Sequence, residues 1–500
     1  MISTLLWTLI AVQIALGGFD TLYHHEVTER LAWRVSQRRE LKLHGVRNLI
    51  YGALFATLGW SEVHGALAWA VIAFLGVEIV ITLADFVEED ASRKLPATER
   101  VTHTLLALNY GAILILLVPV LLGWAGEGTG VVPAFHGLWS AMASAAAFGV
   151  CVFGLRDLAA AARAPRLVPK PAAALVTALP RHQTILVTGA TGFVGSRLVE
   201  GLAAAGHDVI VLTRTAEKAL ALRPPFRLVT DLEQIDGATR IDAIVNLAGE
   251  PVSGGLWTGK RKRAIVESRK SVMAALLRLI GRLEHAPRVL IGASAIGWYG
   301  LRGDEELTED AAPATGSFSH ESCAVIERET DKARAFGLRV VGLRIGLVLG
   351  TEGGLLARLL LPFEFGLGGR IGSGQQWMSW IARDDLVRLI AHAIATDDLE
   401  GPVNATAPTP VRNAEFAAAL GHALHRPAVM PLPALPLRLL GAFGKELLLG
   451  GQRVVPRKAL ASGFAFAYPT LPMALDSMLG IKAAREHVVH AEAAHRWRMG

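Results

Sequence analysis

The stretch Thr184-Ile-Leu-Val-Thr-Gly189-Ala-Thr-Gly192-Phe-Val-Gly195 joins an apolar run to a glycine-rich turn. Residues 185–187 predict a short buried strand, and residues 196–205 predict a helix that follows the turn. A strand that enters a helix through such a turn presents free backbone N–H groups and the positive end of the helix dipole to a pyrophosphate. We therefore expect a dinucleotide to bind here, and the alternative is a glycine-rich turn without a ligand.

Length and composition indicate a protein of several domains with a membrane part. A chain of 500 residues exceeds a single core, and 52% hydrophobic residues with a mean hydropathy of +0.39 are too apolar for a wholly soluble enzyme. Two cysteines, Cys151 and Cys323, exclude a disulfide framework. The net charge is +6, but no basic block is interleaved with aromatic residues, so nucleic acid is not an expected partner.

Five apolar segments in the region 1–158 approach the roughly 20 residues that cross a bilayer. They cover residues 2–19, 43–60, 66–86, 104–124 and 135–155. Lysine and arginine gather in the connections after the first, third and fifth segments, whereas residues 61–65 and 125–133 carry neither. Because basic loops stay in the cytoplasm, we expect a five-span domain in a bacterial-type inner membrane, with the N-terminus outside and the rest of the chain cytoplasmic.

This topology gathers imidazoles and carboxylates from four spans at one membrane face. They are Asp20, His24, His25, Glu26, His44, Glu78, Asp85, Glu88, Glu99 and His103. Such groups hold transition metals in helical bundles, so a small redox or metal-binding module is one hypothesis. The other interpretation is that residues at span ends are solvated or pair with nearby arginines. We prefer the second interpretation and assign no metal ligands.

The rest of the chain predicts an α/β unit. Alanine and proline in residues 159–183 indicate an exposed tether. Strands are then predicted at 185–188, 208–212, 226–229, 243–247, 289–293 and 339–343, and the clearest helices at 263–283 and 323–336. This alternation predicts a Rossmann-like, doubly wound parallel sheet over 184–425. A small α+β C-terminal domain over 426–482 and a polar helical tail over 483–500 follow.

The end of the second predicted strand favours NADP(H) over NAD(H). A cofactor with a free ribose 2′-hydroxyl usually meets an acidic residue at this point, whereas a 2′-phosphate needs a cation. The chain reads Thr213-Arg214 here, without Asp or Glu. A planar guanidinium pairs well with a phosphate. The alternative is that Arg214 is a solvated residue at a strand end.

Several motifs in order resemble one family. Besides residues 187–195, they are Val245-Asn-Leu-Ala-Gly-Glu-Pro251, Trp257 with Glu267-Ser-Arg269, residues 355–374, Trp380-Ile381 with Asp384-Asp385-Leu386, and Gly450-Gly-Gln-Arg-Val-Val-Pro456. Residues 184–480 resemble the short-chain dehydrogenase/reductase superfamily, and within it the bacterial sugar-nucleotide-epimerase-like (NAD-dependent epimerase/dehydratase) family. The resemblance implies a Rossmann domain that binds NADP(H), and a smaller C-terminal region that closes over the substrate.

The resemblance also implies which residues contact the cofactor. The expected contacts are Gly189, Thr191, Gly192, Phe193, Val194 and Gly195 at the pyrophosphate, Thr213 and Arg214 at the ribose phosphate, and Leu247, Ala248 and Arg269 beside the rest of the molecule.

The usual reaction of the superfamily needs a serine on the fifth strand and a Tyr-x-x-x-Lys pair on the next helix. Ser294 fits the serine, but residues 317–323 contain neither tyrosine nor lysine. Tyr299, His320 and Cys323 are the possible substitutes, and we favour Tyr299 as the proton carrier. The alternatives are that Tyr299 packs under the cofactor, that His320 is solvated, and that Cys323 packs as a small apolar residue.

Two functions remain after these observations. The first is a membrane-anchored NADP(H)-binding oxidoreductase or epimerase-like enzyme that acts on a carbonyl or carbinol carbon of a small-molecule substrate. The second is a non-catalytic NADPH-binding module, tethered to the lipid bilayer, in which the cofactor stabilises one conformation.

Overall fold

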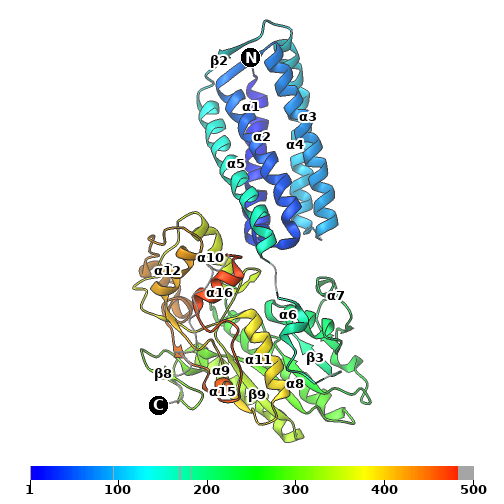
Figure 1. Ribbon diagram of the computed structural model, residues 1–500, viewed down its shortest axis with the longest axis vertical. Coiled ribbons are helices and arrows are strands. Elements are labelled where there is room, and N and C mark those ends of the chain that lie inside the picture. The colour runs from blue at the N-terminus through cyan, green and yellow to red at the C-terminus, as the bar shows by residue number, and fades with distance from the viewer. Residues whose placement is uncertain (1, 94, 168–169, 181, 482–500) are drawn as a thin grey trace. The chain divides into compact units, whose positions relative to one another are not determined.

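The computed structural model describes residues 2–93, 95–167, 170–180 and 182–481 (Figure 1). The chain forms two compact units, Met1–Val168 and Pro169–Gly500, and each is described by itself. The tail predicted over 483–500 lies outside the described residues.

The first unit is a bundle of helices. They are α1 (Thr4–Phe19), which continues as the π-helix η1 (Asp20–Glu29), α2 (Arg38–Trp60), α3 (Ala66–Ser92), α4 (Ala97–Ala125) and α5 (Leu138–Arg163). Four segments of the described chain are long and apolar enough to cross a membrane: Thr4–Glu29, Ala66–Ser92, Ala97–Ala125 and Leu138–Arg166. The helix α2 forms where the second span is predicted, but it is not among the four, and its first turns carry several charged residues.

The helix α2 nevertheless runs along the bundle with the others. The strand β1 (Ser61–His64) joins α2 to α3, and β2 (Gly130–Pro133) joins α4 to α5. The two strands pair antiparallel, so the C-terminal ends of α2 and α4 lie at the same end of the bundle. From this end α3 leads back towards the opposite end, where the first turns of α2 lie.

Three glycines spaced seven residues apart hold α2 close to α5. A Cβ atom at Gly45 would lie 2.6 Å from the Leu158 side chain, and one at Gly59 would lie 2.7 Å from the Cβ atom of Ala143. A Cβ atom at Gly52 would overlap the Cys151 sulfur. Because small residues let two helices approach, this seam fixes α2 in the bundle by packing.

The predicted tether is shorter than expected. Residues 159–163 continue α5, and the short helix η5 (Ala172–Leu175) packs against the second unit's first long helix. Leu175 and Val176 are 2% and 1% exposed and belong to the core of the second unit. The prediction of an exposed linker over 159–183 is therefore wrong for these residues, because apolar side chains among the alanines and prolines are buried.

The second unit is built on a seven-stranded parallel sheet in the order β13-β9-β7-β6-β3-β4-β5. The strands are β3 (Thr184–Thr188), β4 (Asp208–Leu212), β5 (Arg227–Val229), β6 (Ala243–Asn246), β7 (Val289–Ala295), β9 (Arg339–Ile345) and β13 (Gly401–Ala405). All six predicted strands form. The chain starts at β3, proceeds to one edge, and returns to the other side of β3 as β6. This reversal is the topological switch point at which doubly wound sheets bind ligands.

Alternate residues of the strands face two layers of helices. Ile185 and Val187 pack in one core with Leu198 of α6 (Phe193–Ala204) and residues of α11 (Arg383–Ala395). Leu186 packs in the opposite core with Leu276 of α8 (Gly259–Arg282). The predicted doubly wound architecture is thus confirmed.

The C-terminal region packs within the same unit. The strand β15 (Arg453–Val454) pairs with β8 (Glu306–Leu307), and the Asp385 carboxylate accepts hydrogen bonds from the N–H groups of Ala467 and Tyr468 at 2.9 Å. The remaining α-helices and strands are α7 (Ala216–Ala219), α9 (Phe318–Asp331), β10 (Leu347–Gly350), α10 (Gly354–Glu364), β11 (Trp377–Met378), β12 (Trp380–Ala382), β14 (Val411–Arg412), α12 (Asn413–Ala423), α13 (Ala434–Arg438), α14 (Gly441–Phe443), α15 (Arg457–Ala461) and α16 (Leu471–Met478).

Because β3 and α6 cross closely at Gly195, we expect a single added methyl group there to lower the stability of the second unit. A Cβ atom at Gly195 would lie 2.8 Å from the Ala190 Cα atom and 2.9 Å from the Gly189 carbonyl carbon, and neither backbone atom can move away freely. We expect Gly195→Ala to destabilise this unit by about 1–3 kcal/mol through overpacking. Hydrogen exchange of peptides covering β3 and α6, measured by mass spectrometry, reports the change.

The matched control is Gly342→Ala in β9, where an added Cβ atom meets nothing within 4 Å. Equal protection of the β3 and α6 peptides from hydrogen exchange in the two variants would contradict the prediction.

Candidate functional site

The glycine turn leaves an open helix N-terminus at the switch point. Gly189 has a φ of +67°, and a Cβ atom there would lie 2.6 Å from the Leu247 carbonyl. Gly192 is the N-cap of α6, is exposed, and leaves the helix without a side-chain cap. The first N–H groups of α6 therefore have no side-chain acceptor and are available to an anion.

A buried polar pair fixes the strand ends around this turn. The Thr188 hydroxyl donates to Asn246 Oδ1 at 2.6 Å and accepts from the Ala248 N–H at 3.3 Å. The Leu247 N–H donates to the Thr188 carbonyl at 3.2 Å. Sequence reasoning missed Thr188 and Asn246, although a polar residue at the end of each of two buried strands was a usable signal.

The other predicted residues of the turn differ in orientation. The Phe193 ring packs against the turn before α10, where a Cβ atom at Gly353 would lie 2.5 Å from it. Val194 packs against the core next to the sheet, and Thr191 is half-buried beside the exposed Gly192. Phe193 and Val194 therefore face this site with their backbone.

Arg214 is free to meet a ligand at the end of β4. Its side chain is exposed, and within the described part of the chain it forms no hydrogen bond or ion pair. The neighbouring Thr213 is buried, and its hydroxyl accepts a hydrogen bond from the Thr215 N–H at 3.4 Å. Since β4 pairs with β3, the guanidinium lies one strand away from the glycine turn.

Arg269 lies beside the segment that follows β6. Its Nη1 donates to the carbonyls of Glu250 at 3.0 Å and Ile265 at 2.9 Å. A Cβ atom at Gly249 would lie 2.6 Å from the guanidinium carbon. Burial lowers the pKa of Arg269. The structure thus brings Arg269 next to Gly249 and Glu250, which directly follow Leu247 and Ala248 in the chain.

Ser294 ends β7 and belongs to a charged network. Its hydroxyl donates to Glu327 Oε1 at 2.8 Å. Arg344, 3% exposed, donates to the same carboxylate from Nε at 3.0 Å and from Nη2 at 2.9 Å. Neither Glu327 nor Arg344 was predicted, although an arginine within the apolar strand β9 was a signal. The arrangement holds a serine hydroxyl against an oriented carboxylate.

Tyr299 is fully buried and its hydroxyl is occupied. It donates to Asn404 Oδ1 at 2.7 Å and accepts from Arg344 Nη1 at 3.1 Å. Burial raises the pKa of Tyr299. The structure thus favours a packing role for Tyr299 over the expected role as proton carrier, because the side chain is fully buried and Asn404 and Arg344 occupy its hydroxyl.

The other two candidates are also engaged. His320 lies in the first turn of α9, with Nδ1 2.6 Å from the Trp298 carbonyl. Cys323 is 5% exposed, and burial raises the pKa of its thiol to about 11. Cys323 is therefore a buried, neutral thiol on α9.

In the helical unit, most of the polar residues gathered by the predicted topology are buried. They are Asp20, His24, His25, Glu26, His44, Glu78, Asp85 and Glu99, all at most 9% exposed. The preferred interpretation of solvated residues is wrong for this set. Pairing with arginine is correct for some, since Arg93 contacts Glu99 at 2.7 Å and Arg39 contacts Glu88 at 3.2 Å. Sequence reasoning missed Glu89, which lies one helical turn after Asp85.

The burial of Cys323 predicts how it responds to an alkylating reagent. Since the thiolate is the nucleophile and the pKa is about 11, we expect iodoacetamide to leave Cys323 unmodified at pH 8 in the folded protein. Mass spectrometry of the peptide that contains Cys323 measures the modified fraction. The same peptide should react after denaturation at pH 8, and rapid reaction of the folded protein at that pH would contradict the prediction.

Comparisons with known proteins agree with this geometry. The model described as the NAD dependent epimerase/dehydratase family matches residues 185–405, and that of a domain of unknown function, DUF1731, matches residues 432–478. The chloroplastic SDR39U1 homolog of Arabidopsis thaliana is 38% identical over 308 residues, which are 60% of this chain and 87% of the relative. The epimerase family protein YfhF of Bacillus subtilis is 36% identical, over 59% of this chain and 97% of its own length.

One solved structure has the same fold as the second unit. The crystal structure of human epimerase family protein SDR39U1 (isoform 2) with NADPH is 31% identical, with a TM-score of 0.53, and the match covers 59% of this chain and 99% of that one. Both matched family models lie in the α/β unit. The chain belongs to the NAD dependent epimerase/dehydratase family, with a C-terminal DUF1731 domain, and its relatives include the SDR39U1 proteins.

Proposed function

We propose that the second unit binds NADP(H) and acts as an oxidoreductase or epimerase-like enzyme on a carbonyl or carbinol carbon of a small molecule. The observation that carries the proposal is the uncapped N-terminus of α6 at the switch point, with the exposed Arg214 one strand away. The glycine turn would bind the pyrophosphate, and the Arg214 guanidinium would bind an additional phosphate of the dinucleotide.

The residues around the turn fit the cofactor. Gly192 leaves room above the first turn of α6, since a Cβ atom there would meet only the Gly189 carbonyl. Arg214 would hold the 2′-phosphate, and Leu247 and Ala248 would lie along the cofactor. The human relative carries NADPH in its crystal structure, which supports the preference for NADP(H) over NAD(H).

The network at Ser294 would handle the substrate oxygen. A bound nicotinamide supplies or accepts a hydride. In the oxidising direction, the substrate hydroxyl would give its proton to Ser294 Oγ while the serine proton passes to Glu327. Arg344 keeps the Glu327 carboxylate in position. In this proposal Ser294 and Glu327 carry the proton in place of the tyrosine and lysine of the superfamily.

Three observations favour the second candidate, a non-catalytic NADPH-binding module. The helix α9 contains neither tyrosine nor lysine, the Cys323 pKa is about 11, and the Tyr299 hydroxyl is occupied. Incubation with NADPH and a panel of lipid-soluble carbonyls and quinones separates the two functions. Loss of absorbance of the reduced nicotinamide supports the enzyme, and tight binding without oxidation supports the module.

We also propose that the first unit anchors the protein in a bacterial-type inner membrane, with the N-terminus outside and the α/β unit in the cytoplasm. Four of its helical segments have the length and hydropathy of membrane spans. The more polar α2 would cross as a fifth span, because β1 and β2 place its C-terminal end beside the start of α3. The glycine seam against α5 supports this position.

The proposed role of Arg214 can be tested by the choice between NADPH and NADH. A charged hydrogen bond to a phosphate contributes about 1.5–3 kcal/mol, so Arg214→Ala should weaken NADPH binding about 10- to 100-fold and leave NADH binding unchanged. Calorimetric titration of the purified protein with each coenzyme measures both affinities. The control is Arg223→Ala, an exposed arginine that pairs with Glu200. If Arg214→Ala kept the wild-type preference for NADPH, Arg214 would not be the residue that holds the 2′-phosphate.

Because Ser294 would transfer a proton but not hold the cofactor, we expect its removal to lower turnover without weakening NADPH binding. Removing a proton-transfer group lowers the rate by about 10²–10⁴-fold, so Ser294→Ala should lower kcat by that factor and keep the NADPH affinity. The measurement uses the carbonyl substrate that the panel identifies. Ser322→Ala is the control, because this α9 hydroxyl only donates to the Ser319 carbonyl. Equal kcat values for the two variants would exclude Ser294 from the reaction.

A further inference from the structure

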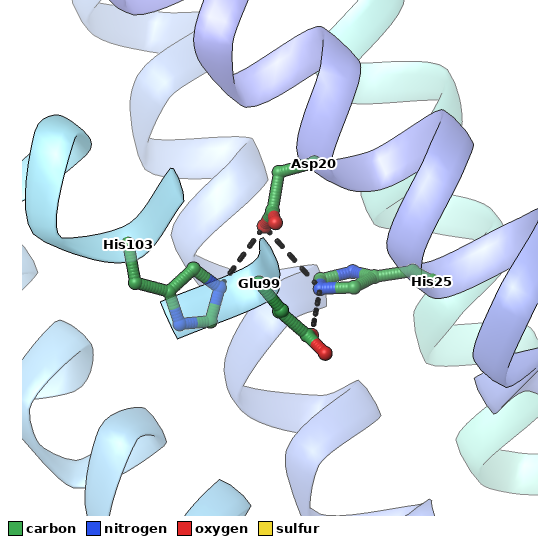
Figure 2. A group of neighbouring side chains, drawn as sticks. All are labelled: Asp20, His25, Glu99 and His103. Atoms are coloured by element: carbon green, nitrogen blue, oxygen red, sulfur yellow. Dashed lines mark hydrogen bonds and ion pairs between the residues drawn. The ribbon is translucent and has the colours of Figure 1, made fainter. Parts of the chain in front are cut away.

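The helical unit contains a compact group of ionisable side chains that anchoring does not explain. We call it the buried His/carboxylate cluster: Asp20, His25, His44, Asp85, Glu89, Glu99 and His103. Six of the seven are at most 5% exposed, and His103 is half-buried. They come from η1, α2, α3 and α4, so the cluster draws the four segments together (Figure 2 shows four of its members). Buried charges of this kind are costly unless something compensates them.

The nitrogen and oxygen atoms of the cluster converge on two overlapping points. Ligand atoms of Asp20, His25, Glu99 and His103 lie within 4.8 Å of one another. Figure 2 shows these four side chains pointing toward one another. The ligand atoms of His25, His44 and Glu89 also lie within 4.8 Å of one another. The two sets share His25, whose ring stacks on that of His44 with centroids 4.5 Å apart.

The spacing of these atoms suits a shared ion. His25 Nε2 lies 3.4 Å from Asp20 Oδ2 and 3.7 Å from Glu99 Oε1. Glu89 Oε1 lies 3.4 Å from His44 Nε2, and Glu89 Oε2 lies 3.3 Å from His103 Nδ1. Bonds of 2.0–2.2 Å to one metal place neighbouring ligand atoms roughly 3.0–3.5 Å apart. Most of these separations therefore resemble the edges of a coordination shell.

Several of these atoms have no hydrogen bond. Among the described residues, His25 Nε2 and both carboxylate oxygens of Glu89 are buried without a hydrogen-bond partner, whereas His44 Nε2 pairs with Asp85 Oδ2 at 2.8 Å. An unmade hydrogen bond at a buried polar atom costs about 1–3 kcal/mol. An ion bound between the imidazoles and carboxylates would give these three atoms a partner.

The charges of the cluster also favour a cation. Five carboxylates lie together here when Glu40, which Arg93 contacts at 3.0 Å, is included. Two guanidinium groups oppose them: Arg93 bridges Glu40 and Glu99, and Arg47 contacts Asp85 at 2.7 Å. The arginines leave Asp20 and Glu89 without a guanidinium, and these two carboxylates face the histidines.

The local backbone places Asp20 and His25 on one face. Residues 20–29 form a π-helix, whose hydrogen bonds join residues five apart. Asp20 and His25 are five apart, so a regular α-helix would turn one of them away from the cluster. His24 supports Asp20 from outside, since its Nδ1 lies 2.9 Å from Asp20 Oδ1. Single π-helical turns are frequent at functional sites.

A cavity gives access to the cluster. Its volume is about 570 Å³, and Glu89 and His103 lie in its wall beside apolar residues such as Phe86 and Leu95. An ion or a small ligand can therefore reach two members of the cluster from the outer face of α3 and α4.

We propose that the buried His/carboxylate cluster binds a first-row transition-metal ion. The candidate ligands are the members of the two overlapping sets, which share His25: imidazole nitrogens of His25, His44 and His103, and carboxylate oxygens of Asp20, Glu89 and Glu99. Nitrogen and oxygen ligands without a thiolate select iron, manganese or zinc in their divalent states. The helical unit is then a metalloprotein module in addition to an anchor.

The test uses the full-length protein in detergent, freed of metal with a chelator and titrated with Co(II), which has visible absorption bands. Saturable Co(II) binding that Zn(II) displaces is expected for the wild type. His44→Gln reports on the set that contains Glu89, and His103→Gln on the set that contains Asp20. At least one variant should bind Co(II) more weakly by more than about 100-fold, since removing even a supporting residue costs 10–100-fold.

The matched control is His64→Gln, a buried histidine of the same unit in β1 that pairs with Glu127. It should bind Co(II) like the wild type. Size-exclusion chromatography and circular dichroism identify variants that fold, and Glu89→Gln replaces a variant that does not. Absence of saturable binding in the wild type, or equal affinities in the wild type, the cluster variants and the control, would overturn the proposal.

Discussion

The α/β unit depends on two close backbone crossings at the glycine turn. Gly189 brings the end of β3 against the carbonyl of Leu247, and Gly195 brings α6 against the Gly189–Ala190 backbone. Neither crossing has room for a side chain, so the first helix starts directly over the end of the central strand. This position leaves the N–H groups of α6 open at the point where the sheet reverses its order. The nucleotide site is therefore a consequence of how strand and helix pack.

A second constraint is the buried Arg344. Its guanidinium joins the Glu327 carboxylate, the Tyr299 hydroxyl and the Trp298 ring, whose centroid lies 3.4 Å away. A buried guanidinium needs these partners, because leaving it unpaired is expensive. Tyr299 is thus used for structure, while Ser294 at the end of β7 keeps a hydroxyl against the same carboxylate. One arginine thereby organises both the packing and the polar wall of the site.

Local sequence patterns predicted the strands, the glycine turn and Arg214, because each depends on residues close together in the chain. The Ser294–Glu327–Arg344 network depends on pairing between distant segments, and no local pattern reveals it. The tether was misjudged because Leu175 and Val176 stand among alanines and prolines, where apolar side chains have no period. In the helical unit, the predicted topology identified which ends of the spans meet, but it did not show that their polar side chains are buried. Glu89 was missed although it follows Asp85 by four residues, the spacing that shares a helix face.

The burial of the His/carboxylate cluster indicates that the helical unit has a role besides anchoring. A bundle that only anchors an enzyme gains nothing from five buried carboxylates, since apolar residues of similar volume would pack at lower cost. Arg47 and Arg93 compensate part of the charge, but they contact Asp85, Glu40 and Glu99 and leave Glu89 to the histidines. Structural ion pairs alone would close with hydrogen bonds, yet His25 Nε2 and both Glu89 carboxylate oxygens have none. A cluster whose ligand atoms gather in two overlapping sets is therefore better explained by a bound ion than by packing.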